Sequence, residues 1–359
     1  MAYTTIDDPG EYFNTIVYEG NEDNSGIQAQ TGVGFQPDLV WVKNMEGAYG
    51  HIWVDSVRGV GQTLTSRSTA AEEDEAGTVE VFGSDGFTVG QASQAAGPAV
   101  NQDEKDHVAW CWKCETAFSN DASATSVGSI DSVGKVNTDA GFSIITYTGT
   151  GSAGTIAHGL GVTPAWIVVK RRSATEHWQV YHAANTAAPA TDYLQLSTAE
   201  ATVDAATRWN DTVPTSTVFS VGAHASVNAD ASTYVAYCFA EKKGYSKFGS
   251  YTGNGNADGT FTYTGFKPAF VLKKNISVTR DWGINDIERE PFNTNDNILR
   301  PNLDNAEQSN SAYAMDFLSN GFKLRGTDAE INTSGNTYIY MAFAENPFVT
   351  STGVPATAR

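Results

Sequence analysis

The chain has 359 residues, of which 40% are hydrophobic, so it can bury the cores of two or three ordinary domains and is not a disordered chain. Its 34 glycines and low charged content of 18% suit many short strands and turns and argue against a helical bundle. The net charge of −19 is repelled by nucleic-acid phosphates and by anionic membrane surfaces, so neither is an expected partner.

The first eight residues contain no basic region and no apolar run, so we do not expect a signal peptide. No stretch of the sequence approaches the roughly 20 apolar residues that a helix needs to cross a bilayer. The three cysteines are an odd number and cannot form a complete disulfide framework. We therefore expect a soluble protein that is made in a reducing cytosol.

Four landmarks follow one another three times along the chain. They are a tyrosine two residues before a glycine, a proline six residues before a lysine across an apolar run, a phenylalanine that opens a short strand, and a longer apolar strand. Their copies lie at Tyr18, Tyr147 and Tyr251; Pro37–Lys43, Pro164–Lys170 and Pro268–Lys274; Phe87, Phe219 and Phe322; and His107–Trp112, Tyr234–Phe239 and Tyr338–Phe343. Because order, residue type and spacing recur together, we interpret the chain as three copies of one module of about 100 residues.

The repeated segments are rich in β-branched and aromatic residues, which is typical of strands. In chain order we expect strands at residues 13–20, 39–43, 108–113, 142–149, 166–170, 235–241, 247–253, 270–274 and 338–345. The Gly86-Phe87 and Gly321-Phe322 pairs follow polar turn residues and predict a turn before a strand. Short helical turns are expected at residues 69–76 and 302–308.

Short strands with turn signals and no crossover helices predict an all-β fold. We expect three tandem antiparallel β-sandwich modules with jelly-roll or lectin-like topology. The modules are expected at residues 1–114, 140–243 and 244–359, the last with a short C-terminal tail. Residues 115–139 are small, polar and poor in aromatics, and are expected to form a flexible linker.

Cys111 and Cys114 form a CxxC motif, a pattern found in zinc and redox sites. However, Cys111 aligns with Cys238 and Ala342 in the other copies, which indicates a small buried position. Residues three apart on a strand also point to opposite faces, so the two thiols are poorly placed to share a metal. We predict that these cysteines are structural.

The other candidate groups also favour structural roles. His51 lies near Trp53 and His177 lies beside Trp178, but the third copy has Asp281-Trp282, so the aromatic recurs while the imidazole does not. No nucleophile motif is found. The carboxylates Glu72–Glu75, Asp55, Asp286 and Glu288 are interpreted as solvated surface charge. The Asn254–Gly259 segment is interpreted as an ordinary hairpin loop. The lysines Lys43, Lys170 and Lys274 are interpreted as exposed charges that end a strand. The sequence thus predicts no catalytic, cofactor-binding or metal-binding residues and no cofactor.

Several segments together resemble a module of structural proteins from tailed bacteriophages. These segments are Phe35–Asn44, Asp55–Gly59, Ser84–Gly90, Val108–Lys113 and the ending Ala342–Phe348, which is followed by a short tail to Arg359. The resemblance covers nearly the whole chain, but its motifs are packing and turn motifs. It implies a virion protein of the tail-fibre, lectin-like or capsid-decoration type and carries no catalytic residues.

The resemblance leads us to expect a non-enzymatic virion protein, assembled in the host cytoplasm, with two possible placements. One is a capsid decoration or cement protein that binds the major capsid protein or other virion proteins and stabilises the shell. The other is a tail fibre or receptor-binding protein that contacts host surface glycans. The sequence contains no heptad or collagen-like shaft, which favours the shell placement. A homo-oligomer, a trimer, is the expected assembly because trimers are common in both roles.

Overall fold

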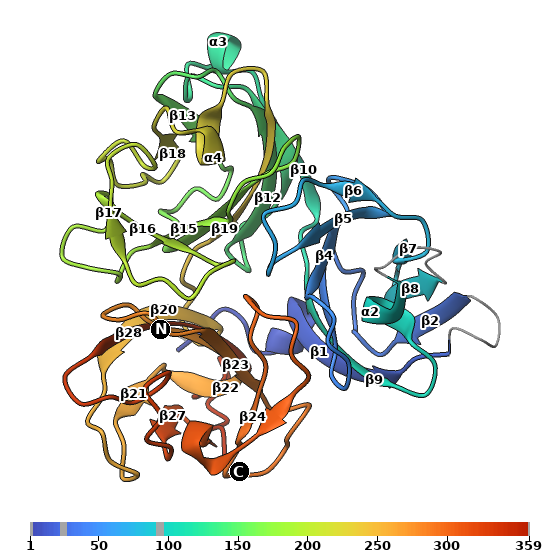
Figure 1. Ribbon diagram of the computed structural model, residues 1–359, viewed down its shortest axis with the longest axis vertical. Helices are drawn as coiled ribbons and strands as arrows, with labels where there is room; N and C mark the ends of the chain where they lie inside the picture. Colours follow the sequence, from blue (N-terminus) through green and yellow to red (C-terminus); the bar gives the residue numbers. More distant parts are fainter. Residues whose placement is uncertain (1–2, 22–26, 91–96, 358–359) are drawn as a thin grey trace.

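The computed structural model describes residues 3–21, 27–90 and 97–357 and has an all-β fold, as the sequence predicts. Figure 1 shows three lobes arranged around a common centre. Every strand pair outside the isolated bridges is antiparallel. Residues 1–2 and 358–359, which belong to the predicted N-terminal segment and C-terminal tail, lie outside the described residues.

Each lobe contains one large sheet and smaller pairing strands. The first lobe contains η1 (Pro9–Glu11), β1 (Phe13–Glu19), β2 (Ile27–Thr31), β3 (Leu39–Asn44), β4 (Ile52–Asp55), β5 (Gln62–Thr65), β6 (Glu73–Asp74), β7 (Val79–Gly83), β8 (Gly86–Gly90), α2 (Gly97–Asn101) and β9 (Asp106–Trp112). Its large sheet has the order β1-β9-β3-β4-β5-β6 and its small sheet the order β2-β8-β7. The hairpin between β7 and β8 contains the predicted Gly86-Phe87 turn.

The second lobe contains β10 (Thr116–Asn120), α3 (Ala122–Thr125), β11 (Ser132–Asn137), β12 (Phe142–Thr148), β13 (Gly154–Ala157), β14 (Trp166–Arg171), β15 (Gln179–His182), β16 (Asp192–Gln195), β17 (Val203–Asp204), β18 (Val218–Val221), α4 (Ala225–Asn228) and β19 (Thr233–Phe239). Its large sheet has the order β10-β11-β12-β19-β14-β15-β16-β17, and β13 pairs with β18. The two sheets enclose a core of buried apolar side chains.

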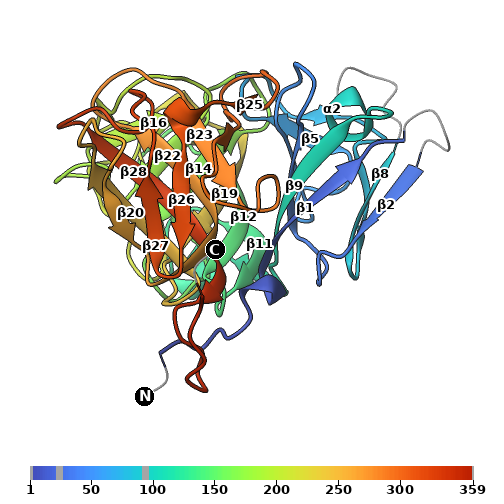
Figure 2. The same cartoon turned by 90° about the horizontal axis from the view of Figure 1, so that it is seen from below.

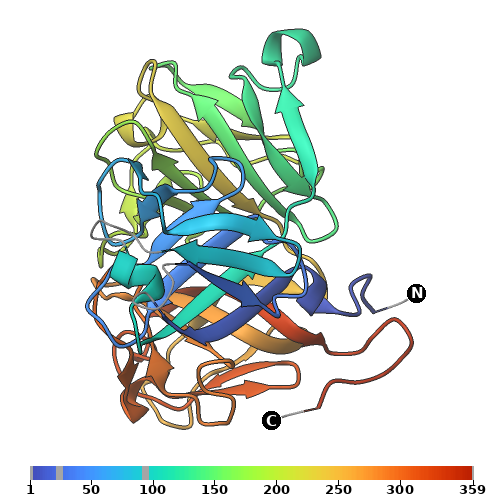
Figure 3. The same ribbon diagram turned by 90° about the vertical axis from the view of Figure 1, so that its right-hand side faces the viewer.

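The third lobe contains β20 (Ser246–Thr252), β21 (Phe261–Tyr263), β22 (Phe266–Asn275), β23 (Trp282–Asp286), β24 (Asn297–Ile298), β25 (Gln308–Ser309), η2 (Ser311–Tyr313), β26 (Met315–Leu318), β27 (Gly321–Leu324) and β28 (Thr337–Pro347). Its sheets have the orders β20-β28-β22-β23 and β21-β27-β26, and β24 pairs with β25. The chain then continues into a short tail that meets the N-terminal segment where Ser351 N donates to Asp7 Oδ1 at 2.6 Å. Figures 2 and 3 show both termini leaving the molecule on the same side.

The large sheets are buried on both faces, which explains why their strands are continuous apolar runs. In β3, Val40 and Val42 point into the core of the first sandwich, whereas Leu39 and Trp41 point into a core shared by all three lobes. The shared core joins aromatic rings from every lobe. Its large rings are Phe13, Trp41, Trp53, Trp110, Trp112, Phe142, Trp166, Trp178, Tyr237, Phe239, Tyr245, Phe248, Phe270, Trp282 and Phe343.

The expected linker and the expected helical turns are both wrong, because these segments form backbone hydrogen bonds with a neighbouring strand or lobe. Residues 115–139 are not a flexible linker, because β10 and β11 form a hairpin that extends the sheet beyond β12. Residues 69–76 and 302–308 contain no helical turn. They run along the next lobe instead, where Glu72 N donates to Arg172 O and Glu307 N donates to Met45 O.

The recurring tyrosine-x-glycine landmark fixes one corner in each lobe. The hydroxyls of Tyr18, Tyr147 and Tyr251 donate to the carbonyls of Val100, Val227 and Ile331. The following glycines make room for that same segment, because a Cβ on Gly149 would lie 2.3 Å from Ala229 O. The landmark is therefore a packing motif.

Replacing Gly149 with alanine tests this interpretation. We expect G149A to lower the free energy of unfolding by about 2–3 kcal/mol, because backbone must move to relieve the overlap. The exposed neighbour Thr148 is the control, and T148A is expected to change the free energy by no more than about 0.5 kcal/mol. Denaturant unfolding gives both values, and equal effects of the two substitutions would contradict the assignment.

Candidate functional site

The recurring lysines hold the lobes together, contrary to their predicted role as exposed charges. Lys43, Lys170 and Lys274 are fully buried. Lys170 Nζ donates to Thr69 O at 3.1 Å, and Lys274 Nζ donates to Ala199 O at 3.1 Å, in each case a carbonyl of another lobe. Lys43 Nζ reaches Asp304 O at 3.4 Å. Burial lowers the pKa of each of these lysines to about 8.

Backbone hydrogen bonds close the same ring. Glu72 N donates to Arg172 O, Thr202 N donates to Ile276 O, and Glu307 N donates to Met45 O, at 2.8, 3.2 and 2.7 Å. The three acceptors follow their lobes' recurring lysines by two residues each. The first lobe therefore pairs with the second, the second with the third, and the third with the first.

The expectation that a tryptophan recurs beside the histidines is wrong for the first lobe. Trp178 Nε1 donates to Thr65 O and Trp282 Nε1 donates to Gln195 O, each across a lobe boundary. His51, and not Trp53, occupies the corresponding position in the first lobe, where its Nδ1 accepts from Trp41 Nε1 at 2.9 Å. Burial lowers the pKa of His51 well below its ordinary value, so the ring is a neutral core group.

The CxxC thiols are buried in different cores, Cys111 within β9 and Cys114 just after it. Cys111 lies in the core of the first sandwich and Cys114 in the shared core. Burial raises the pKa of both thiols, which keeps them protonated and unreactive at neutral pH. Among the described residues, no cluster of three or more His, Cys, Asp or Glu side chains could hold a metal ion.

Two predicted surface carboxylates are in fact buried ion-pair partners. Asp55 Oδ2 accepts from Arg58 Nε at 2.5 Å, and Asp286 Oδ2 accepts from Arg289 Nε at 2.6 Å. Each carboxylate also binds another lobe, through Tyr237 Oη to Asp55 at 2.7 Å and Trp110 Nε1 to Asp286 at 3.1 Å. These acids are neutralised and enclosed, so they stabilise lobe contacts and do not form a cleft acid pair.

The third lobe contains a buried polar cluster that sequence reasoning missed. Lys273 stands where β3 and β14 carry valine, and its Nζ donates to Asn285. Arg300 Nε donates to Glu330 Oε2 at 3.0 Å nearby. Burial lowers the pKa of Lys273 to about 7 and raises that of Glu330 to about 7. The sequence signal for this cluster was Lys273, an additional lysine directly before the recurring Lys274.

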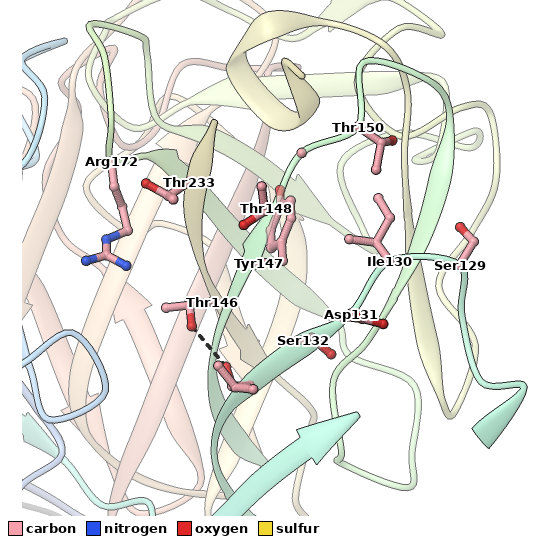
Figure 4. Close-up of a pocket in the computed structure, with 12 residues that line it drawn as sticks. Ser129, Ile130, Asp131, Ser132, Thr146, Tyr147, Thr148, Thr150, Arg172 and Thr233 are labelled. Atoms are coloured by element: carbon pink, nitrogen blue, oxygen red, sulfur yellow. Dashed lines mark hydrogen bonds between the residues drawn. The ribbon is translucent and has the colours of Figure 1, made fainter. Parts of the chain in front are cut away.

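A groove lined by several hydroxyl groups lies in the second lobe, beside β11 and β12, and has a volume of about 550 Å³. Figure 4 shows the hydroxyls of Ser129, Ser132, Thr146 and Thr148 and the Arg172 guanidinium around it. Arg172 forms ion-pair hydrogen bonds with Glu72, and Asp131 Oδ1 accepts from Ala122 N. The groove can hydrogen-bond a polar ligand, but both of its charged groups already have partners.

The remaining candidates are structural. The Asn254–Gly259 segment satisfies its own polar groups, since Asn254 Nδ2 donates to Asp258 O and the Asp258 carboxylate pairs with Lys323. All eight tryptophans are buried, so none offers an exposed ring to a ligand. Glu288 lies beside a narrow groove next to β1. His177 Nδ1 is 3.0 Å from Ser197 Oγ.

A family model described as a domain of unknown function, DUF7483, matches residues 8–347. The chain belongs to this family. It has no match among curated proteins or solved structures. Within the described residues, no helix is long and apolar enough to cross a membrane.

Replacing Lys170 with methionine tests the role of the lysines. We expect K170M to lower the free energy of unfolding by about 1–3 kcal/mol at pH 7, because it removes the lysine hydrogen bonds to Thr69 O and Glu176 O. The loss should grow between pH 8 and pH 10, because in this range folding releases the proton of Lys170 and stability rises with pH in the wild type.

The control is K247M, which removes a lysine whose side chain is 31% exposed and pairs with Glu241. Its effect at pH 7 should stay within about 0.5 kcal/mol. Urea unfolding at several pH values measures both variants. A pH-independent difference between wild type and K170M would show that Lys170 titrates as an ordinary surface lysine.

Proposed function

We propose that this chain is a non-enzymatic structural protein of a tailed-bacteriophage virion, and that it decorates the capsid and stabilises the shell. The observation that carries the proposal is the use of its recurring residues. The tyrosine, glycine, lysine and cysteine positions all serve packing or lobe contacts. Tyr147 and Gly149 also line the groove beside β11 and β12, but the Tyr147 hydroxyl already donates to Val227 O. The resemblance of five segments to phage structural proteins supports a virion protein, and the lack of a heptad or collagen-like shaft in the sequence favours the shell over the tail.

The close connection of the three lobes also supports a role in stabilising the shell. Three sandwiches share one aromatic core and are tied in a closed ring by buried hydrogen bonds, so no lobe can separate without exposing charge and apolar surface. A shell binds many copies at repeated sites, so modest contacts per copy add up. The proposed partners are the major capsid protein or other virion proteins, with the chain acting as a homo-oligomer, a trimer, in the assembled virion.

Counting and locating the protein in intact particles tests the proposal. We expect a copy number comparable to that of the major capsid protein, with density over the shell in electron cryomicroscopy. Particles lacking the protein should release their DNA at lower temperature or after milder osmotic shock, and adding the purified protein back should restore resistance. A few copies confined to the tail would refute capsid decoration.

A tail fibre or receptor-binding protein that contacts host glycans is the second candidate. The hydroxyl-lined groove beside β11 and β12 favours it, because hydroxyls and an arginine suit a sugar (Figure 4). The buried state of all eight tryptophans weighs against it, because sugar sites commonly use an exposed aromatic ring.

A glycan array tests this second function directly. If the groove binds a sugar, T148W should fill it and lower binding at least about tenfold, equivalent to roughly 1.4 kcal/mol. The matched control is T252W, at the corresponding exposed position of β20, which should bind as the wild type does. Equal binding by wild type and both variants would exclude this groove as the glycan site.

A further inference from the structure

Three side chains of the third lobe, Lys273, Asn285 and Glu330, occupy positions where the other lobes carry no amine, amide or carboxylate. The register of the strands and the tyrosine corners define the equivalent residues. They are Val42 and Val169 for Lys273, Val54 and Tyr181 for Asn285, and Ala99 and Ser226 for Glu330. Because the three changes occur together in one lobe, the packing that the lobes share does not explain them.

Lys273 and Asn285 meet in the core of the third sandwich. They lie on the adjacent antiparallel strands β22 and β23, where Lys273 pairs with Gly283 and Asn285 pairs with Val271. Their side chains therefore share one face of the sheet, and Lys273 Nζ donates to Asn285 Oδ1. Lys273 is 1% exposed and Asn285 is fully buried, so the amine and the amide are both shielded from water.

The amide of Asn285 is held with its oxygen toward the lysine. Its Nδ2 donates to Asn295 Oδ1 at 2.9 Å and to Asn297 O at 3.1 Å, so both ends of the amide have a partner. The lysine amine thus contacts the oxygen that is bonded to the amide carbon, Cγ. Holding two reacting groups together in this way replaces a slow bimolecular reaction with an intramolecular one.

The surroundings favour an uncharged, nucleophilic amine. Burial lowers the pKa of Lys273 to about 7, so much of the amine is unprotonated at neutral pH. Burial raises the pKa of Glu330 to about 7, so this carboxyl can both accept and return a proton. Glu330 Oε1 lies beside the residue that pairs with Lys273, since a Cβ on Gly283 would be 3.1 Å from it. Arg300 Nε, at 3.0 Å from Glu330 Oε2, holds the carboxyl in place.

We propose that Lys273 and Asn285 form an intramolecular isopeptide bond. Lys273 Nζ, as the free amine, attacks Cγ of Asn285, and Glu330 accepts a proton from Nζ. Glu330 then returns this proton to Nδ2, the Cγ–Nδ2 bond breaks, and Nδ2 leaves as ammonia. The new bond joins Nζ to Cγ while Oδ1 remains the carbonyl oxygen, so the reaction needs no oxidant and no cofactor.

The bond fastens the strand that connects the third lobe to both other lobes. In β23, Trp282 Nε1 donates to Gln195 O of the second lobe. Asp286 Oδ2 of the same strand accepts from Trp110 Nε1 of the first lobe. Asn285 lies between these two contacts, so its link to β22 keeps β23 in place even when the hydrogen bonds of the sheet open. The inference does not depend on the proposed function.

Mass spectrometry of the purified full chain tests the proposal. The intact mass should be about 17 Da below that of the unlinked chain, because one ammonia is lost. After denaturation and digestion with trypsin, residues 281–289 should be joined to the peptide that ends at Lys274. K273M and N285A should have the unlinked mass and give separate peptides. The control K247M, at a lysine whose side chain is 31% exposed, should retain the link.

A further variant tests the part played by Glu330. E330Q keeps the size of the side chain but cannot accept the proton from Lys273 Nζ. Less than about a tenth of this variant should be linked when it is purified in parallel with the wild type. If E330Q does not fold, E330D serves the same purpose, because it retains a carboxyl and should be linked more slowly than the wild type. Linkage of the variant at the wild-type rate would remove Glu330 from the reaction.

Two results would overturn the isopeptide bond itself. The first is a folded wild-type chain that keeps the unlinked mass after several days at neutral pH and gives residues 281–289 as a separate peptide. The second is a loss of ammonia that persists in K273M, because the ammonia would then come from a reaction that does not involve this lysine. Both results come from the wild type and one variant whose apolar side chain matches the valines of the other lobes.

Discussion

Burial of both faces of the large sheets is the constraint on which the rest of this structure depends. One face packs against a small sheet of the same lobe, and the other packs against aromatic rings of the other two lobes. Contacts across lobe boundaries include Phe13 stacked on Phe343 with ring centroids 4.8 Å apart and Trp166 against Trp282 at 5.8 Å. A single lobe would expose that second face to water, so the lobes depend on one another.

Doubly buried sheets leave polar groups at lobe boundaries with few partners, and the recurring lysines meet that need. A buried ammonium group is costly, and the cost appears as a pKa near 8. The buried ammonium groups of Lys170 and Lys274 are satisfied because each donates to a carbonyl of its own lobe and to a carbonyl of another lobe. Two buried ion pairs, Asp55–Arg58 and Asp286–Arg289, also contribute to the lobe boundaries. The carboxylate of each pair accepts a hydrogen bond from an aromatic side chain of another lobe.

The lobes are similar in their packing and differ at the edges of their large sheets. Their cores use the same positions, whereas β12 pairs with β11 on its outer edge and the equivalent strands β1 and β20 are terminal strands of their sheets. The third lobe also replaces a core valine with Lys273 and supports it with Asn285. Differences among otherwise similar units therefore carry more functional information than the shared landmarks do.

Strand positions were readable from the sequence because continuous runs such as Leu39–Asn44 and Trp166–Arg171 have the composition of doubly buried strands. The placement of Cys111 in a small buried site was also predictable, because alignment of the repeated segments exposed it. By contrast, residues 115–139 were expected to be a flexible linker. Their small polar composition does not reveal that the open edge of β12 would order them.

By itself, the sequence determined the all-β class, the strands of the large sheets and the structural character of the cysteines, since these follow from local composition and spacing. Only the tertiary structure decided that the lysines are buried, that His51 takes the place of a tryptophan and that Asp55 and Asp286 are enclosed. The lysines, Asp55 and Asp286 each have a hydrogen-bond partner in another lobe more than 60 residues away along the chain. Local patterns give the strands, but the ring that closes around them is set by contacts that no local pattern encodes.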